Sequence, residues 1–137
     1  MKWYRLAAEQ GNANAQLNLG LMYGKGQGVR KDNTIAVKWY RLAAEQGYPD
    51  ALFNLGAMYD KGRGVPQDDK TAVKWYRLAV AQGNADAQNN LGVMYANGRG
   101  ISKNNKTALR QYRLAAEQGN DDAQTLLDDY EKHIEGD

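Results

Sequence analysis

The side chains that most often perform covalent chemistry are scarce in this chain of 137 residues. The sequence holds no cysteine, one serine, Ser102, and one histidine, His133. Nucleophilic hydrolysis requires a hydroxyl or thiol beside a base, and Ser102 occupies a variable position in a turn, remote from His133. A single histidine without cysteine also provides no transition-metal site. We therefore expect no catalytic residue, no metal and no cofactor.

A glycine-rich segment has the composition of a loop that cradles phosphate. It reads Gly24-Lys25-Gly26-Gln27-Gly28, and related turns follow at Gly62-Arg63-Gly64 and Gly98-Arg99-Gly100. A nucleotide-binding loop follows a strand and leads into a helix with a defined residue spacing, whereas this segment follows a helical pattern. We interpret the glycines as the residues that end one helix and let the chain reverse.

Aromatic and basic residues alternate in the triplets Trp3-Tyr4-Arg5, Trp39-Tyr40-Arg41 and Trp75-Tyr76-Arg77, a combination that could stack on bases and bind phosphates. The net charge of only +2, with both signs interspersed, provides no basic field for nucleic acid. Because the triplets recur without change, we expect their rings to pack in a core. Glu45 lies four residues after Arg41, which predicts an ion pair on a solvated face.

The triplets belong to a block of about 36 residues that recurs almost four times. Trp3, Trp39 and Trp75 begin the copies, and Gln111 stands at this position in the fourth. A unit repeated at a fixed spacing builds a stack in which each copy contacts its neighbours, rather than a globule with one centre. No apolar run approaches the ~20 residues that a membrane span needs.

Each copy contains two apolar patterns with helical spacing, which we call helix A and helix B. Helix A is represented by Pro49 to Asp60, and helix B starts after a capping residue such as Asp32 and ends at a glycine such as Gly47. We predict an all-α fold, an α/α superhelix or solenoid of helix-turn-helix repeats with eight helices. A partial N-terminal helix B, three full repeats and a C-terminal capping helix are expected at 1–11, 12–47, 48–83, 84–119 and 120–137.

Three phrases recur in register along the chain. They are Ala-Gln-x-Asn-Leu-Gly-x-Met-Tyr at 15–23 with close versions at 51–59 and 87–95, the Gly-x-Gly-Val turn, and Trp-Tyr-Arg-Leu-Ala-Ala-Glu-Gln-Gly. Together they resemble the Sel-one-like repeat (SLR) family, and the resemblance covers nearly the whole chain. The long turn between helices A and B favours this family over the related tetratricopeptide repeats.

The resemblance implies an α/α superhelix that acts as an adaptor or scaffold, with helix A lining a concave surface, and it implies no catalysis. Members of the family serve bacterial surface, secretion, signalling and host-interaction pathways and eukaryotic protein quality control. A cysteine-rich secreted branch has been linked to binding or hydrolysis of β-lactams, which is the alternative function for this chain. Because all of those cysteines are missing here, we favour the scaffold.

Positions that differ between copies are free to contact a partner, whereas identical positions are expected to build the core. On helix A a variable stripe runs along one side at spacings of three and four residues. We predict a concave surface that binds a peptide or protein segment, made of this stripe and the asparagines beside it: Leu17, Asn18, Leu21, Phe53, Asn54, Ala57, Asn89, Asn90 and Val93.

Two parts of this prediction have open alternatives. Phe53, the only phenylalanine, could anchor a partner or fill a local gap against a neighbouring helix. Asn18, Asn54 and Asn90 could hydrogen-bond the backbone of a ligand or tie neighbouring repeats together, and we favour the structural role.

The expected partner is protein or peptide, without nucleic acid or membrane. An N-terminal helix B that lacks half of its usual neighbours would also expose Trp3, Tyr4 and Leu6, a pattern that favours weak self-association. Because Met1 opens on sequence that lies inside a helix in the other copies, we interpret the chain as a piece of a longer array. Its compartment is open, a secreted or periplasmic bacterial location being one alternative.

Overall fold

The computed structural model describes residues 2–135, which form eight α-helices and contain no strand. The helices are α1 (Lys2–Glu9), α2 (Ala13–Lys25), α3 (Asn33–Glu45), α4 (Pro49–Lys61), α5 (Asp69–Ala81), α6 (Ala85–Asn97), α7 (Asn105–Glu117) and α8 (Asp121–Glu135). The predicted all-α fold with eight helices is confirmed. Side chains from residue 133 onward lie outside the description, and with them that of His133, considered above beside Ser102.

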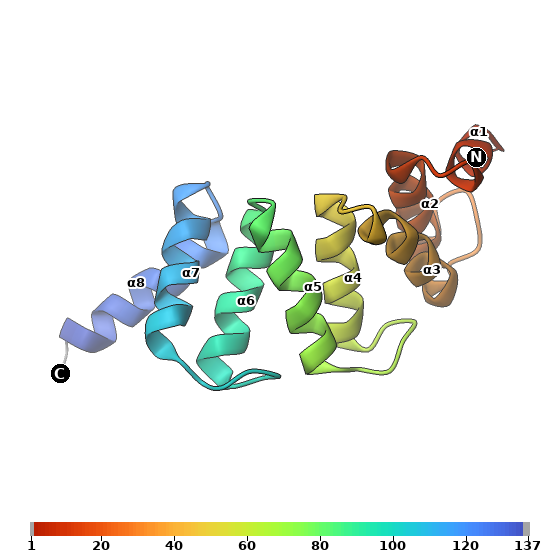
Figure 1. Cartoon of the computed structure of the whole chain (residues 1–137). Helices are drawn as coiled ribbons and strands as arrows, with labels where there is room; N and C mark the ends of the chain where they lie inside the picture. Colours follow the sequence, from red (N-terminus) through yellow and green to blue (C-terminus); the bar gives the residue numbers. More distant parts are fainter. Residues whose placement is uncertain (1, 136–137) are drawn as a thin grey trace.

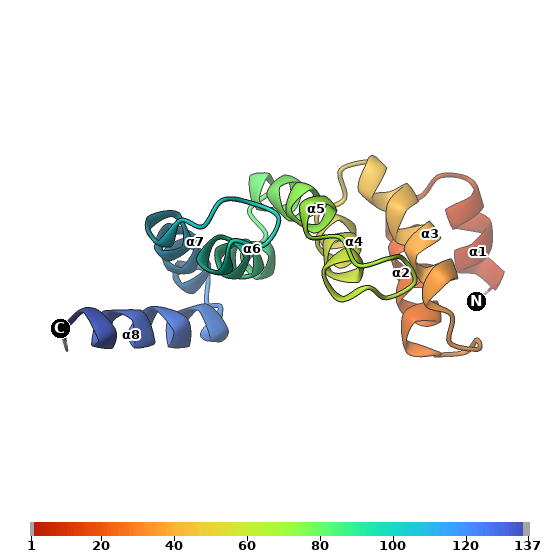
Figure 2. The same ribbon diagram turned by 90° about the horizontal axis from the view of Figure 1, so that it is seen from below.

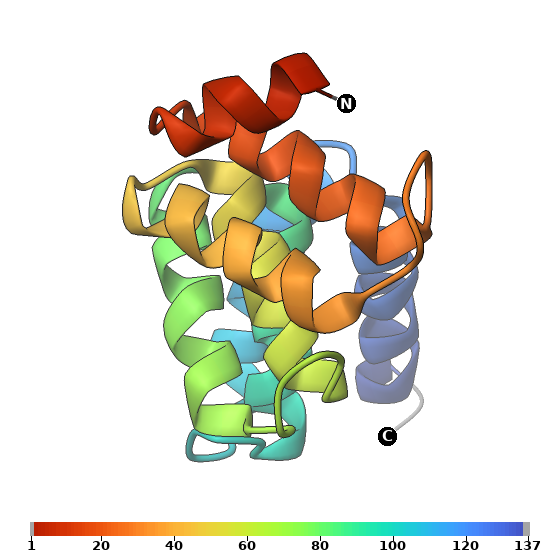
Figure 3. The same cartoon turned by 90° about the vertical axis from the view of Figure 1, so that its right-hand side faces the viewer.

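The helices follow one another along an elongated, curved array with the two ends of the chain far apart (Figures 1 and 2). Within the described residues, extensive packing joins only helices that are consecutive in the chain. Seen along the array in Figure 3, successive helix pairs are rotated relative to one another. The chain is therefore a solenoid of stacked pairs, and none of its described helices has the length and apolarity to cross a membrane.

Side-chain caps determine where most of the helices begin. The side-chain oxygens of Asp32, Asp68 and Asn104 accept a hydrogen bond from the amide three residues ahead, at the start of α3, α5 and α7. Asn12 begins α2 in the same way, whereas Tyr48 makes no capping bond and the next residue, a proline, starts α4. These caps confirm the helix starts expected from the sequence.

The glycine turns end helix A in every full repeat. Gly26, Gly62 and Gly98 lie in the left-handed region at φ of +69°, +66° and +64°. Their amides donate to the carbonyl oxygens of a methionine four residues earlier, which satisfies a carbonyl that the helix leaves open. The turns are helix terminators, as expected, and the phosphate-loop alternative is set aside.

The core contains a glycine-tyrosine contact that recurs in each full repeat. A β-carbon placed at Gly20 would lie 2.5 Å from the ring of Tyr40, and the same close approach joins Gly56 to Tyr76. Both tyrosines are buried, so the core role predicted for these rings is confirmed. The tryptophans beside them are only half-buried, and Trp3 is 70% exposed.

The arginine of each triplet does not pair with an acid on its own helix. Arg41 donates a hydrogen bond from Nη2 to the hydroxyl of Tyr59 at 2.5 Å, from one helix pair to the next. No ion pair joins Arg41 to Glu45 in the structure, so that prediction is wrong. The phenol of the following helix A offers a partner held in place by packing, whereas the Glu45 side chain lies exposed in water, where an ion pair gains little.

Candidate functional site

The nine residues predicted to bind a partner lie on α2, α4 and α6, and their exposure differs. Leu17 is 6% exposed and Asn89 is 9% exposed. Leu17 packs in the core cluster that extends from α2 to α6, and both side chains therefore face neighbouring helices more than solvent. The remaining seven side chains are half-buried, and we call them the helix-A face: Asn18, Leu21, Phe53, Asn54, Ala57, Asn90 and Val93.

Phe53 is placed between two helices. Its ring stacks on that of Tyr76 in α5, with centroids 6.0 Å apart and an interplanar angle of 30°. The side chain joins the main core cluster from its edge and keeps part of its surface exposed. Phe53 therefore fills a gap against a neighbouring helix, the second of the two alternatives, while the exposed part of its ring stays available to a partner.

The three asparagines that occur at the same position of helix A have three different surroundings. Asn18 donates from Nδ2 to the side chain of Asn14 on its own helix at 2.9 Å. Asn90 donates to the hydroxyl of Tyr76 at 3.3 Å and so ties α6 to α5. Asn54 has no hydrogen bond to another described residue. The structural role, a tie between neighbouring repeats, therefore holds for Asn90.

The surface is hollowed where α2 and α3 meet α4, a contact that we call the first junction. The pocket there has a volume of about 390 Å³ and includes Leu21 and Asn54 of the helix-A face. Its lining residues include three cations and no acid. The full lining of this first-junction pocket is Leu21, Gly24, Lys25, Lys31, Asn33, Tyr40, Asn54, Met58 and Arg63.

Burial raises the pKa of Tyr40 in this pocket to about 12, so its hydroxyl stays protonated and can donate a hydrogen bond well above neutral pH. Apart from Asn54, sequence reasoning missed the polar residues of the pocket, because they come from two helices and two turns. A comparison of position 24 with position 60, glycine in one copy and aspartate in the next, is the signal that could have revealed it.

The second junction, where α4 and α5 meet α6, is closed by an acid. Tyr76 donates its hydroxyl proton to Asp60 Oδ2 at 2.9 Å, and Arg99 Nη2 lies 2.6 Å from Asp60 Oδ1 and 2.8 Å from Asp69 Oδ1. Burial, followed by the charge of Asp60, raises the pKa of Tyr76 well above its usual value. Hydrogen bonds to Asp69 and Asp60 raise the pKa of Arg99.

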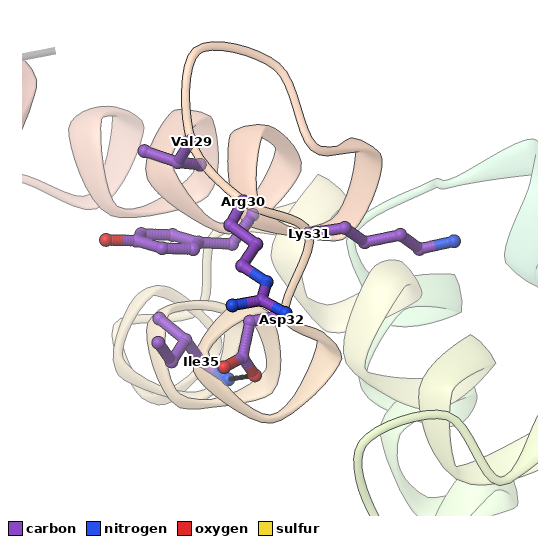
Figure 4. Close-up of a pocket in the computed structure, with 6 residues that line it drawn as sticks. Val29, Arg30, Lys31, Asp32 and Ile35 are labelled. Atoms are coloured by element: carbon purple, nitrogen blue, oxygen red, sulfur yellow. Dashed lines mark hydrogen bonds between the residues drawn. The ribbon is translucent and has the colours of Figure 1, made fainter.

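A second hollow lies under the turn between α2 and α3. It has a volume of about 430 Å³, and its lining includes Val29, Arg30, Asp32 and Ile35 (Figure 4). Asp32 is already engaged there, because its carboxylate caps α3 through the amide of Ile35. In Figure 4, Lys31 extends away from these side chains, and it also lines the first-junction pocket. Lys31 therefore borders both hollows, whereas Arg30 lines only the one under the turn.

The family model described as Sel1 repeat matches this chain over residues 1–12, 13–48, 49–84 and 85–120. A solved protective antigen of uropathogenic Escherichia coli strains, which displays an SLR fold, is 46% identical with a TM-score of 0.88 over 90% of this chain. A Sel1 repeat protein from Oxalobacter formigenes is also 46% identical, with a TM-score of 0.82 over 86% of this chain. No curated protein matches the chain significantly.

The chain spans 26% of the length of the Escherichia coli antigen and 49% of the Oxalobacter protein. Cysteine-rich protein B of Helicobacter pylori is 24% identical with a TM-score of 0.71, over 92% of this chain and 90% of that one, and this likeness shows the fold alone. Repeat period, helix pairing, family model and structural neighbours agree. The chain belongs to the Sel1 repeat family.

Proposed function

We propose that this chain is an interaction module that binds a peptide or protein segment along the helix-A face. Sel1 repeat proteins generally act as scaffolds for protein interaction, which supports this class of function. The observation that carries the proposal is the difference between copies on helix A. Neighbouring copies differ at the half-buried residues Leu21, Ala57 and Val93, and the second repeat adds the only phenylalanine of the chain, Phe53, to the same face.

The helix-A face combines two kinds of side chain in register. Leu21, Ala57 and Val93 occupy one position of successive repeats and provide apolar contact, while Asn54 and its equivalents run beside them. Amide side chains both donate and accept, so they suit the alternating N–H and C=O groups of an extended segment. The half-exposed ring of Phe53 supplies the largest apolar anchor on this face.

The test begins with peptides selected from a random display library on the immobilised array. A selected peptide is then titrated by calorimetry into the wild type and into Phe53→Ala, and at least tenfold weaker binding is expected because an aromatic anchor is lost. Lys106→Ala, on the exposed start of α7 and away from the helix-A face, is the matched control and should bind as the wild type does.

Phe53 also stacks on Tyr76, so thermal unfolding of each variant separates lost binding from lost folding. Phe53→Leu places at this position the residue that the first repeat carries, Leu17, and should keep the fold while losing ring contact. Failure to select any peptide, or equal affinity for wild type and Phe53→Ala, would refute the proposed surface.

Weak self-association through α1 stays a prediction within this function. Trp3 is 70% exposed and Leu6 is 53% exposed, so α1 presents apolar surface that a second copy could cover. Light scattering at rising protein concentration tests it, with Leu6→Lys as the variant that should reduce any dimer. A monomer at every concentration contradicts this part of the proposal.

A further inference from the structure

We propose that the first-junction pocket is a binding site for a carboxylate group. The group would come from the segment held on the helix-A face, as an acidic side chain or a chain terminus. Its origin rests on the proposed function, but the presence of the site does not. The observation behind it is that the second junction contains the same arrangement with its carboxylate built in.

The two junctions can be compared position by position because the repeat is 36 residues long. Five polar positions matter, and each has its equivalent one repeat later. In the order first junction then second, they are Gly24 and Asp60, Asn33 and Asp69, Tyr40 and Tyr76, Asn54 and Asn90, and Arg63 and Arg99.

The backbone places these positions alike in both junctions. A β-carbon at Gly64 would lie 2.6 Å from the carbonyl carbon of Asn33, and one at Gly100 would lie 2.5 Å from that of Asp69. Each turn therefore touches the start of the preceding helix B, and the arginine before each glycine starts from an equivalent place. The tyrosines are aligned in the same way by their contacts with the glycines of helix A.

At the second junction this arrangement holds the carboxylate of Asp60. One oxygen accepts from the hydroxyl of Tyr76 at 2.9 Å, and the other accepts from Arg99 Nη2 at 2.6 Å. Asn90 donates to the same hydroxyl, which leaves the phenol proton to point at the acid. Hydrogen bonds in which the donor, the acceptor or both are ionised are shorter and stronger than those between neutral groups.

At the first junction the donors remain and the acid is gone. Gly24 has no side chain, and a β-carbon there would lie 3.3 Å from the hydroxyl of Tyr40, so an acid on this residue would reach the phenol. Arg63 forms no ion pair with another described residue, in contrast to Arg99. Lys25 and Lys31 add two further cations to the lining.

An anion with two acceptor oxygens would therefore satisfy both the positive charge and the hydrogen-bond donors of the first-junction pocket. Asp69 is also replaced, by the neutral Asn33, so no internal acid competes for Arg63. The volume of about 390 Å³ exceeds that of a carboxylate alone and admits the chain that carries it. The third junction lacks the arrangement, because Ala96 and Leu126 replace Asp60 and Asn90 there.

The experiment uses the isotope-labelled chain and the side-chain Nε–Hε signal of Arg63 in nuclear magnetic resonance spectra. N-acetylalanine presents a carboxylate like that of a chain terminus, and the α-amide of N-acetylglutamate presents one like that of an acidic side chain. Each is titrated at constant ionic strength against sodium chloride. We expect a saturable shift of Arg63 in the millimolar range, and the compound that binds more tightly identifies the source.

Two built-in comparisons sharpen the result. Arg99 is already held by Asp60 and Asp69, so its signal in the same spectra should not move. Gly24→Asp supplies the missing acid and should weaken carboxylate binding at Arg63 at least tenfold. The reverse change, Asp60→Gly with Asp69→Asn, reproduces the first junction and should make Arg99 respond.

An Arg63 signal that shifts no more with carboxylates than with chloride would overturn the site. So would an unchanged response in Gly24→Asp, or tighter binding of inorganic phosphate than of either carboxylate. These titrations need no peptide partner. A positive titration with no selectable peptide therefore refutes only the proposed function. Selected peptides whose affinity is unchanged by Gly24→Asp refute only the assignment of the carboxylate to the bound segment.

Discussion

At the second junction Asp60 lies between Tyr76 and Arg99, whereas at the first junction Gly24 leaves the equivalent space to the surroundings. The glycine-tyrosine packing and the turn contacts are the same in both. At the second junction an acid of the chain itself accepts from the hydrogen-bond donors, whereas the first junction has the donors and no acid. In a repeat array, packing residues must be kept so that each copy can stack, and the residues beside them are free to set what each junction binds.

The largest expected effect tests the packing that the junctions share. Gly20→Ala places a β-carbon 2.5 Å from the buried Tyr40 ring and should destabilise the array by about 1–3 kcal/mol through overpacking. Gly56→Ala, which meets Tyr76 at 2.7 Å, should behave alike. Urea unfolding midpoints measure both. A Gly20→Ala protein as stable as the wild type would show that the glycine contact does not determine the junction.

A second prediction uses the ionisation of the two tyrosines. Burial raises the pKa of Tyr40 to about 12, and Asp60 adds to the effect of burial at Tyr76. A phenol whose pKa is raised by folding stabilises the fold below its unfolded value of 10.0, and this stability is lost as the pH rises through the folded value. Stability should therefore fall between about pH 10 and 12, by on the order of 2 kcal/mol from Tyr40.

Chemical unfolding at a series of alkaline pH values measures this loss, and Tyr40→Phe should make it smaller. Asp60→Asn should lower the pKa of Tyr76, because a nearby negative charge disfavours the phenolate. Carbon resonances of the tyrosine rings report each titration separately. A Tyr76 titration that does not respond to Asp60→Asn would contradict the role assigned to this acid.

A third prediction breaks the internal ion pair. Asp60→Asn removes a charge that is 14% exposed beside Arg99, which is 36% exposed, so screening by water limits the expected loss to about 1 kcal/mol. The difference should shrink at high salt. Thermal unfolding of the wild type and of Asp60→Asn at low and high ionic strength checks this prediction. A stability difference between the two proteins that is the same at both ionic strengths would exclude an electrostatic contribution.

The smallest expected effect concerns the open junction. Gly24→Ala should stabilise the array by up to about 1 kcal/mol, because alanine favours the helix and the Tyr40 hydroxyl, 3.3 Å from the new β-carbon, borders a pocket into which it can shift slightly. The same substitution four residues earlier is the destabilising one described above. Denaturant unfolding of Gly20→Ala and Gly24→Ala therefore compares a glycine that packs against a tyrosine ring with a glycine that leaves space beside a tyrosine hydroxyl. Destabilisation by Gly24→Ala would contradict the open space.

Local rules account for the parts of the fold that could be predicted. Asp32 and Asp68 cap helices because a side-chain oxygen reaches an amide three residues away, whatever the rest of the chain does. Gly26 ends a helix because only glycine enters the left-handed region without strain. The repeat then predicts the solenoid, since each helix pair has an apolar side that only another pair can cover.

The candidate site could be predicted only in part. Helix A and its variable stripe were identified, but periodicity places Leu17, Phe53 and Asn89 at equivalent positions and does not give their exposure. Leu17 and Asn89 are buried, while Phe53 is half-buried. Arg41 likewise donates a hydrogen bond to Tyr59 on another helix and does not pair with Glu45 on its own helix.

The sequence by itself determined the helices, their ends and their order, because those depend on neighbours within a few residues. Tertiary structure decided which side chains meet across the junctions, since Gly24, Tyr40 and Arg63 come together only when one pair packs on the next. Side-chain burial and charge balance are properties of that packing. The absence of an acid from the first-junction pocket is recognised only by comparison with the second junction, where the acid is present.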